Sequence, residues 1–128
     1  MDTRPDPGSA AEAPDSGRVL VFTIAGRDLA VAIGAVIEIR AHRGATDLPL
    51  SLPGIEGVVP VRGRMVTLLD LRQSLGLPAR ARGMRQEVIV LQSKKDRVGL
   101  VVDSVKGVDS SPRGIRLLEI DTLLESLP

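Results

Sequence analysis

The sequence predicts a mainly β protein of small-barrel architecture, and three observations point to this fold class. Apolar residues make up 43% of the chain and are almost all aliphatic, with one Phe and no Tyr or Trp, and β-branched side chains favour strands. Turn signals recur about every ten residues between short apolar runs. No connection between these runs reads as a long amphipathic helix, so about seven short strands are expected rather than a parallel α/β sheet. The 128 residues suffice for one domain, or for two small subdomains that share one core.

The folded domain is predicted to begin near Arg18. Residues 1–17 are rich in Pro, Ala, Gly, Ser and Asp, and we expect a disordered acidic tail there, because this composition buries too little apolar surface to offset the entropy of ordering. Residues 18–128 form the domain. The chain has no Cys, which excludes disulfides and thiol chemistry. It has neither a signal-peptide pattern nor an apolar run near the ~18 residues of a membrane span, so a cytoplasmic protein is expected.

The first half of the domain reads as three strands, an irregular connection and a hairpin. The first two strands flank Ala25-Gly26-Arg27, a short link that suits a tight hairpin, and the third contains Glu38. Residues 41–57 hold the prolines and glycines of the irregular connection. The hairpin "GVVPVRGRMVTLLDLR" then turns at Arg62-Gly63-Arg64. Its Pro60 predicts a strand edge, a bulge or a barrel corner, where a missing N–H is tolerated.

The second half of the domain reads as short strands closed by a short helix. Asp70 ends the hairpin and is expected to cap one helical turn at about residues 71–75. The runs "EVIVLQ" and "RVGLVV" predict two strands around a turn, and "DSVKGV" predicts a further short strand. The last segment begins as a strand at residues 115–120. Asp121 then serves as the predicted N-cap of a helix over residues 122–127.

No set of residues in the sequence predicts catalysis, a metal or a cofactor. His42 is the only histidine and is expected to be an exposed loop residue, because no Ser or carboxylate is placed to form a relay with it. The carboxylates are scattered, and the glycines match no phosphate-binding motif. Two loops could form one basic surface, but no aromatic side chain lies nearby to stack on a base, so nucleic-acid binding is not expected. The basic residues of these loops are Arg80, Arg82, Arg85, Lys94, Lys95 and Arg97.

Glu38 and Arg62 are charges embedded in apolar strands, and two interpretations are open. Each could face solvent in an alternating strand. Alternatively, the two could lie across from each other on adjacent strands, fix a register and present polar atoms on a mostly apolar protein-binding face. Arg62 is the first candidate for binding, since a guanidinium can satisfy several carboxylate or backbone acceptors.

Around these residues the sequence resembles the CheW-like domain of bacterial chemotaxis coupling proteins. The similar segments run in order from about Val19 to Val108: "VIEIR", then "LPLSLPGIEGVVPVRGRMVTLLDLR", then "VIVLQSKKDRVGLVVDSVKGV". The hairpin with "RG" and "LLDLR" is the most specific part. The resemblance implies two SH3-like β-barrel subdomains that share a core, with no catalytic activity and no cofactor.

The resemblance also implies partners and sites. It suggests a scaffold or adaptor that links the cytoplasmic tips of chemoreceptors (methyl-accepting chemotaxis proteins) to the regulatory domain of a CheA-type histidine kinase, at membrane-associated receptor arrays. The alternative is a truncated regulator that binds kinase or receptor without coupling them. Carried over position by position, the partner-binding candidates are Glu38, Ile39, Val61, Arg62, Gly63, Val102, Asp103 and Val105.

The sequence departs from the family's pattern near its C-terminal end. Here a short link over residues 109–114 leads almost directly to "IRLLEIDTLL", where the family continues through a longer stretch that completes the second barrel. We therefore expect an incomplete barrel that lacks one or two strands. The loss would leave an exposed edge at residues 104–108, which a partner could complete.

Overall fold

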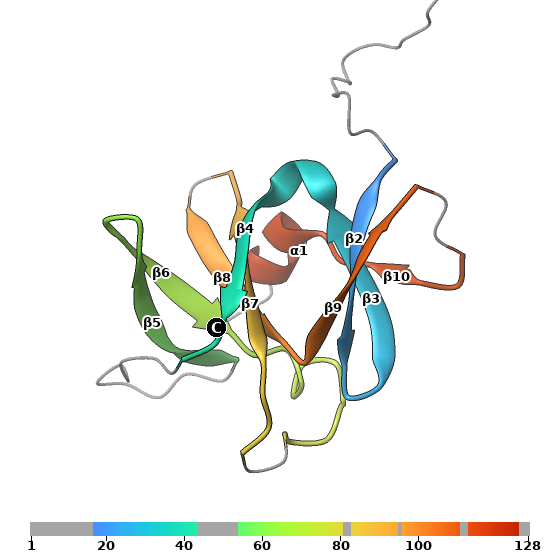
Figure 1. Ribbon diagram of the computed structural model, residues 1–128, viewed down its shortest axis with the longest axis horizontal. Coiled ribbons are helices and arrows are strands. Elements are labelled where there is room, and N and C mark those ends of the chain that lie inside the picture. The colour runs from blue at the N-terminus through green and yellow to red at the C-terminus, as the bar shows by residue number, and fades with distance from the viewer. Residues whose placement is uncertain (1–16, 44–53, 81–82, 95, 111–112, 126–128) are drawn as a thin grey trace, which may run out of the picture.

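The computed structural model describes residues 17–43, 54–80, 83–94, 96–110 and 113–125. These residues form two β-sheets and one short α-helix (Figure 1), so the predicted mainly β class is confirmed. The strands are β2 (Val19–Ile24), β3 (Arg27–Ala32), β4 (Val36–Ala41), β5 (Ile55–Val61), β6 (Arg64–Leu69), β7 (Glu87–Gln92), β8 (Arg97–Val102), β9 (Ser104–Asp109) and β10 (Arg116–Leu117). A 3-10 turn, η2 (Ile33–Ala35), leads into β4, and α1 (Ile120–Glu125) is the helix. The predicted tail lies outside the described residues except for Gly17.

The first sheet has four strands in the order β10-β3-β2-β9. β2 pairs antiparallel with both β3 and β9, whereas β10 pairs parallel with β3. The β2–β3 turn has positive φ at both central residues, 52° at Ala25 and 79° at Gly26, as type I′ hairpin turns require. The predicted tight hairpin is therefore present, and its turn matches the right-handed twist of the two strands.

The second sheet has five strands in the order β4-β7-β8-β6-β5. β5 and β6 form the predicted hairpin, with φ of 51° at Arg62 and 79° at Gly63. β5 is an edge strand, which agrees with the prediction drawn from Pro60, because the outer side of an edge strand needs no backbone donor. β7 and β8 occupy the two runs predicted around a turn, and β8 also pairs parallel with β6.

Three hydrophobic layers alternate with the two sheets. Because successive side chains of a strand point to opposite faces, Val88 and Val90 of β7 face one layer, whereas Ile89 and Leu91 face the next. The layer between the sheets, here called the shared core, draws residues from both of them, from the segments after β6 and β10 and from α1: Leu20, Phe22, Ile24, Leu29, Val31, Leu69, Leu71, Ile89, Leu91, Val98, Leu100, Val102, Leu118 and Ile120.

The other two layers belong to one sheet each. The second face of the five-stranded sheet carries the valine core, made of Val61, Val66, Leu68, Val88, Val90 and Val101. The far face of the four-stranded sheet carries a smaller cluster of Val19, Val21 and Ala30, with Ile115 packed against them. The two subdomains thus share their largest core, while the four-stranded side has the smallest one among the described residues.

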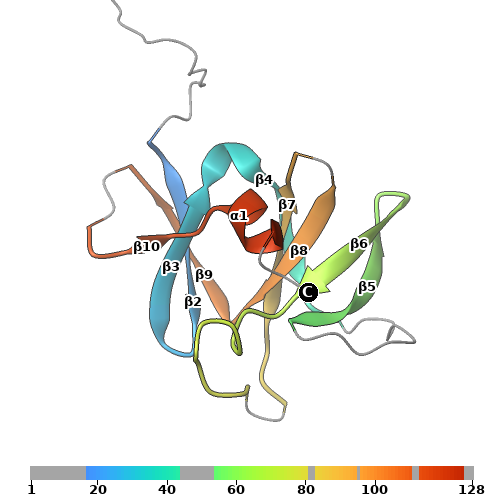
Figure 2. The same ribbon diagram turned by 180° about the vertical axis from the view of Figure 1, so that it is seen from behind.

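The C-terminal helix closes one end of the shared core. α1 lies between the two sheets on the face seen in Figure 2, with Ile120 buried and Leu123 and Leu124 packed against the shared core. The helix begins at Ile120 rather than after Asp121, so the predicted N-cap is wrong: the Asp121 carboxylate accepts the backbone N–H of Lys94 at 2.9 Å instead. The predicted residues 126 and 127 of the helix lie outside the described part of the chain. No helix in that part is long and apolar enough to cross a membrane.

Candidate functional site

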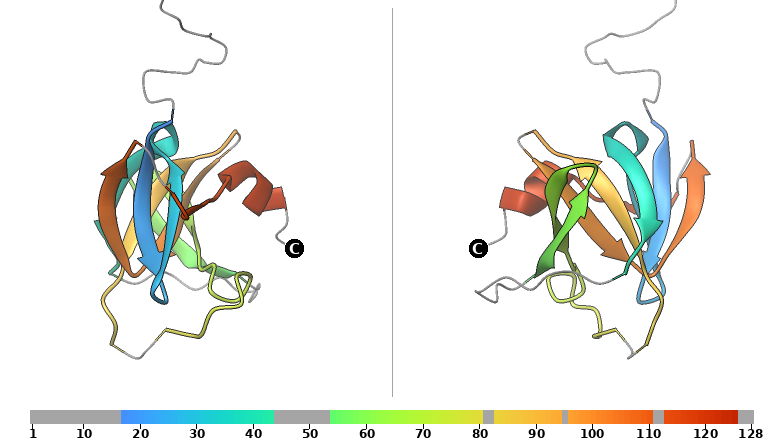
Figure 3. Two further views of the ribbon diagram at one scale, coloured as in Figure 1. Left: turned by 90° about the vertical axis from the view of Figure 1, so that its right-hand side faces the viewer. Right: turned by 60° about the vertical axis from the view of Figure 1, so that its left-hand side comes forward.

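Glu38 and Arg62 meet at a seam between the two edge strands of the five-stranded sheet. The sheet curls so that β4 comes towards the β5–β6 hairpin (Figure 3), and Nε of Arg62 donates to Oε1 of Glu38 at 2.5 Å. Of the two interpretations that the sequence left open, the structure supports the contact between the two residues, but not on adjacent paired strands: Arg62 lies in the hairpin turn, and three strands separate β4 from β5 in the sheet. The ion pair therefore joins sheet edges and fixes no backbone register.

A second pair joins the same two edges. The imidazole of His42, directly after β4 and beside Arg43, contacts the carboxylate of Glu56 on β5. The His42 side chain is only 5% exposed, so the prediction of an exposed loop residue is wrong. Its partner could not be identified from the sequence, since Glu56 follows an irregular connection. The seam, defined by Glu38, His42, Glu56 and Arg62, thus closes the sheet with side chains.

The backbone of Arg62 adopts a conformation that most residues avoid. Its φ of 51° lies in the left-handed region, which residues other than Gly, Asn and Asp rarely adopt. The Arg62 side chain is nevertheless 71% exposed, so packing does not explain why an arginine stands there. Ala25 has the same positive φ in the β2–β3 turn, so the type I′ turn accounts for the backbone conformation, and the side chain of Arg62 is what distinguishes this turn.

Positive charge gathers around the Glu38 end of the seam. The hydrogen bond from Arg62 lowers the pKa of the Glu38 carboxyl, against the opposing effect of burial, and the charges of Arg62, Arg40 and Arg97 lower it further. The same hydrogen bond raises the pKa of Arg62. Two guanidiniums therefore contact this carboxylate, and Nη1 of Arg40 lies 3.7 Å from Oε2 of Glu38. Ile39 is 41% exposed but pairs with Ile89, whereas Glu38 and Arg40 pair with Val90 and Val88, so the Ile39 side chain points to the other face of β4.

The other candidates on the hairpin differ in accessibility. Gly63 is exposed in the turn beside Arg62. Val61 is 1% exposed and belongs to the valine core, so its side chain holds the hairpin on the sheet and offers nothing to a partner. The exposed members of this predicted site are Ile39, Arg62 and Gly63, and the half-buried Glu38 lies with Arg62 on the face of β4 opposite to Ile39.

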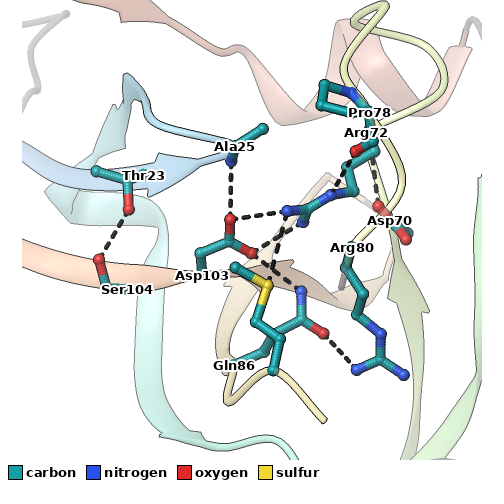
Figure 4. Close-up of polar contacts among 10 residues, drawn as sticks. Thr23, Ala25, Asp70, Arg72, Pro78, Arg80, Gln86, Asp103 and Ser104 are labelled. Carbon is teal, nitrogen blue, oxygen red and sulfur yellow. Dashed lines mark hydrogen bonds and ion pairs between the residues drawn. The ribbon is translucent and has the colours of Figure 1, made fainter. Parts of the chain in front are cut away.

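The remaining candidates lie at the corner where the chain passes from β8 to β9, away from the seam. Val102 is fully buried in the shared core, and Val105 packs against that core. Between them, the carboxylate of Asp103 accepts two hydrogen bonds from the Arg72 guanidinium, both of 2.8 Å, and one of 2.8 Å from the backbone N–H of Ala25 (Figure 4). The eight predicted residues therefore form two groups, one around the seam and the hairpin and the other at the β8–β9 corner.

The Asp103 corner is a buried polar clamp between the sheets. The side chains of Arg72 and Asp103 are 7% and 10% exposed, and Gln86 donates a further hydrogen bond of 3.1 Å to Asp103. Burial alone would raise the pKa of Asp103, but the hydrogen bonds from Arg72, Ala25 and Gln86 outweigh it and lower the pKa. The hydrogen bond with Asp103 likewise raises the pKa of Arg72. Both groups are charged, and together they hold the β2–β3 turn of one sheet to the β8–β9 corner that joins the two sheets.

Arg72 and Gln86 were not singled out from the sequence. Arg72 donates through Nε to the carbonyl of Pro78 at 2.8 Å, and its backbone N–H donates to Asp70 at 3.0 Å, which confirms Asp70 as a cap of the short helical turn. The only signal for Arg72 was its place in the motif "LLDLR". No local signal pointed to Gln86, because its role depends on the carboxylate of Asp103, 17 positions along the chain.

The predicted exposed edge is present. β9 is the last strand of the four-stranded sheet, and Val108 near its end is 47% exposed. The other edge, β10, carries Leu117 at 55% exposure.

The comparisons with known proteins agree with this architecture. The chemotaxis protein CheW of Rhizobium meliloti is 34% identical over 101 residues, covering 78% of this chain and 65% of that protein. The protein PilI of Pseudomonas aeruginosa is 31% identical over 117 residues, covering 91% of this chain and 62% of that protein. The chain thus spans less than two thirds of the length of either relative.

A solved structure has the same fold. The crystal structure of the scaffolding protein TtCheW from Thermoanaerobacter tengcongensis aligns with a TM-score of 0.68 and 25% identity, covering 76% of this chain and 66% of that one. The CheW-like domain family matches residues 18–114, which include both sheets up to β9, the seam and the buried clamp. The chain therefore belongs to the CheW-like domain family.

Proposed function

We propose that this protein is a non-catalytic adaptor of chemotaxis-type signal transduction, which links chemoreceptor cytoplasmic tips to the regulatory domain of a CheA-type histidine kinase. The observation that carries the proposal is the seam. An exposed arginine of the β5–β6 turn bridges there to Glu38 on the opposite edge strand, and Arg40 brings a second guanidinium to the same carboxylate. Relatives named for chemotaxis, and a related scaffolding protein of the same fold, support this role.

In this proposal the seam binds one partner and the clamp keeps the subdomains in a fixed relative orientation. Arg62 is the anchor, because arginine side chains contribute disproportionately to binding energy at protein interfaces. Asp103 acts indirectly, since its buried carboxylate holds the corner between the sheets rather than reaching a partner. The protein would then work in the cytoplasm, at receptor arrays to which its partners bring it.

A second candidate is a regulator that binds the kinase or the receptor without coupling them. It is favoured by the open β9 edge, together with the small core on the outer face of the four-stranded sheet. Such a domain would have one complete partner-binding surface, on the five-stranded sheet, and one incomplete surface, on the four-stranded sheet.

Titration calorimetry separates the two functions. The purified chain is titrated with a receptor-tip helical hairpin, with the kinase regulatory domain, and with one in the presence of the other. Binding of both at once is the expected result for the adaptor. Binding of only one partner, or mutual exclusion of the two, would reject coupling in favour of the regulator.

Arg62→Gly tests the anchor without disturbing the turn. Glycine accepts the positive φ, so the hairpin should keep its thermal stability, while at least one partner should bind about tenfold more weakly without the guanidinium. Arg27→Ala is the matched control, since Arg27 follows the equivalent Ala25-Gly26 turn of the other hairpin and is also exposed. Equal affinities for the two variants would remove Arg62 from the site.

A further inference from the structure

Strand β9 is bordered by a paired strand on one side only. β2 lies along one side, and no described residue pairs with the other through a backbone ladder. Unpaired edges are templates for association with another extended chain, and proteins usually protect them. Two side chains protect this edge.

The first protection is a carboxylate from the other sheet. Glu87 begins β7 and lies opposite Val102 on β8. Its Oε1 accepts the backbone N–H of Val105 at 2.9 Å. A donor near the start of β9 is thereby occupied by a side chain and cannot pair with an incoming strand.

The second protection is a bulge that carries a lysine. Phe22 pairs with Val105 and Val21 with Gly107, so Lys106 has no partner residue on β2. Its ammonium group lies 3.1 Å from Asp28 of β3, across the intervening strand. Bulges and lysines are both common at edges that must stay unpaired.

We propose that β9 is a latent pairing edge for a second copy of this chain, and that Glu87 holds it closed. The sequence of β9 complements itself in an antiparallel pairing. When Val105 of one copy lies opposite Val108 of the other, Ser104 of each lies opposite Asp109 of the other, and Lys106 lies opposite Gly107 rather than a second lysine. A two-fold axis through this pairing uses the same surface on both copies and closes as a dimer.

The apolar side chain at the centre of this contact is already exposed. Val108 is 47% exposed at the edge, and pairing with Val105 of the second copy would cover it. The pairing requires the Glu87 carboxylate to leave the N–H of Val105, because one donor cannot serve both acceptors well. Glu87 is therefore a residue that selects between the single chain and the strand-paired dimer.

Sedimentation equilibrium of three variants tests the proposal, with far-ultraviolet circular dichroism as the check on folding. Glu87→Ala should strengthen self-association about tenfold relative to the natural sequence, the factor expected when one competing hydrogen bond is removed. Glu87→Gln keeps an acceptor oxygen at the same length and should behave like the natural sequence. Glu87→Ala combined with Val108→Lys should return to the self-association of the natural sequence, because it places a charge in the paired edge.

Each outcome decides the matter. Equal self-association of folded Glu87→Ala and the natural sequence would overturn the proposal. So would dimerisation that persists in the Val108→Lys double variant, since the contact would then lie elsewhere. If Glu87→Ala does not fold, Val108→Lys in the natural background takes its place, because it should abolish the weak dimer that the natural sequence forms at high concentration. An unchanged dimer, or a natural sequence that stays monomeric at every concentration, would then reject β9 as the edge.

Discussion

Asp103→Asn is the substitution that most directly tests how the two sheets are held together. Asparagine has nearly the shape of aspartate but no charge, so the variant removes the electrostatic half of the clamp and leaves its packing in place. The Arg72 side chain, 7% exposed in the natural sequence, would stay buried with the carbonyl of Pro78 and one amide oxygen as its acceptors. A buried cation would then lack its counter-ion.

The expected cost follows from that burial. Removing one partner of a buried ion pair destabilises a protein by about 3–5 kcal/mol, because the other charge is left uncompensated. Asn keeps one acceptor oxygen, so we expect about 3 kcal/mol for Asp103→Asn, a large share of the roughly 5–15 kcal/mol that stabilises a domain. Arg72→Met together with Asp103→Asn should cost less than the two single changes added, with a coupling of about 1–3 kcal/mol.

Urea unfolding at neutral pH measures this cost. The chain has no Trp or Tyr, so the transition is followed by far-ultraviolet circular dichroism. A fall in the midpoint at constant slope is a change in stability. A loss below about 1 kcal/mol for Asp103→Asn would refute the clamp as a structural joint, since buried pairs are expected to cost several times that amount.

Two further predictions concern packing and pH. Gly99→Ala should destabilise the domain by about 1–3 kcal/mol, since a Cβ there would lie 2.5 Å from Cδ2 of Leu68 and 2.8 Å from Cγ1 of Val88. Urea unfolding measures the loss of stability. The control is Gly34→Ala, because a Cβ at Gly34 meets no atom within 4 Å. An unchanged midpoint for Gly99→Ala would mean that the valine core has spare room. Because the pKa of Asp103 is lowered on folding, the stability that this carboxylate contributes is complete above its unfolded pKa of about 4. That stability is lost as the pH falls through the folded-state pKa. The urea midpoint should therefore fall less steeply below pH 4 in Asp103→Asn than in the natural sequence. Parallel declines would show that other carboxylates dominate the acid response.

Local signals in the sequence predicted the strands and their turns. Two apolar runs with a polar turn between them predicted β7 and β8, and successive side chains of β7 face two different cores. Pro60 predicted a strand that could do without a backbone donor, and β5 is an edge strand. The "LLD" ending predicted a cap, which Asp70 provides. Each of these features depends on residues within a few positions of one another.

Contacts across the fold were predicted less well. For Glu38 and Arg62 the sequence left open whether they face solvent or meet on adjacent strands, because a sequence shows which residues share a strand and not how far a sheet curls. His42 was expected to be exposed, and its partner Glu56 lies beyond an irregular connection whose path no local pattern fixes.

The sequence by itself determined the mainly β class, the two glycine turns and the residues that carry charge into apolar strands. Only the tertiary structure decided that those charges close a seam between opposite edges, that Asp103 is clamped by Arg72 and Gln86, and that Glu87 covers the edge at β9. The physical reason is that strand periodicity is set by neighbours along the chain. Ion pairs between sheets depend instead on sheet order and curvature, which arise from the packing of all the strands together.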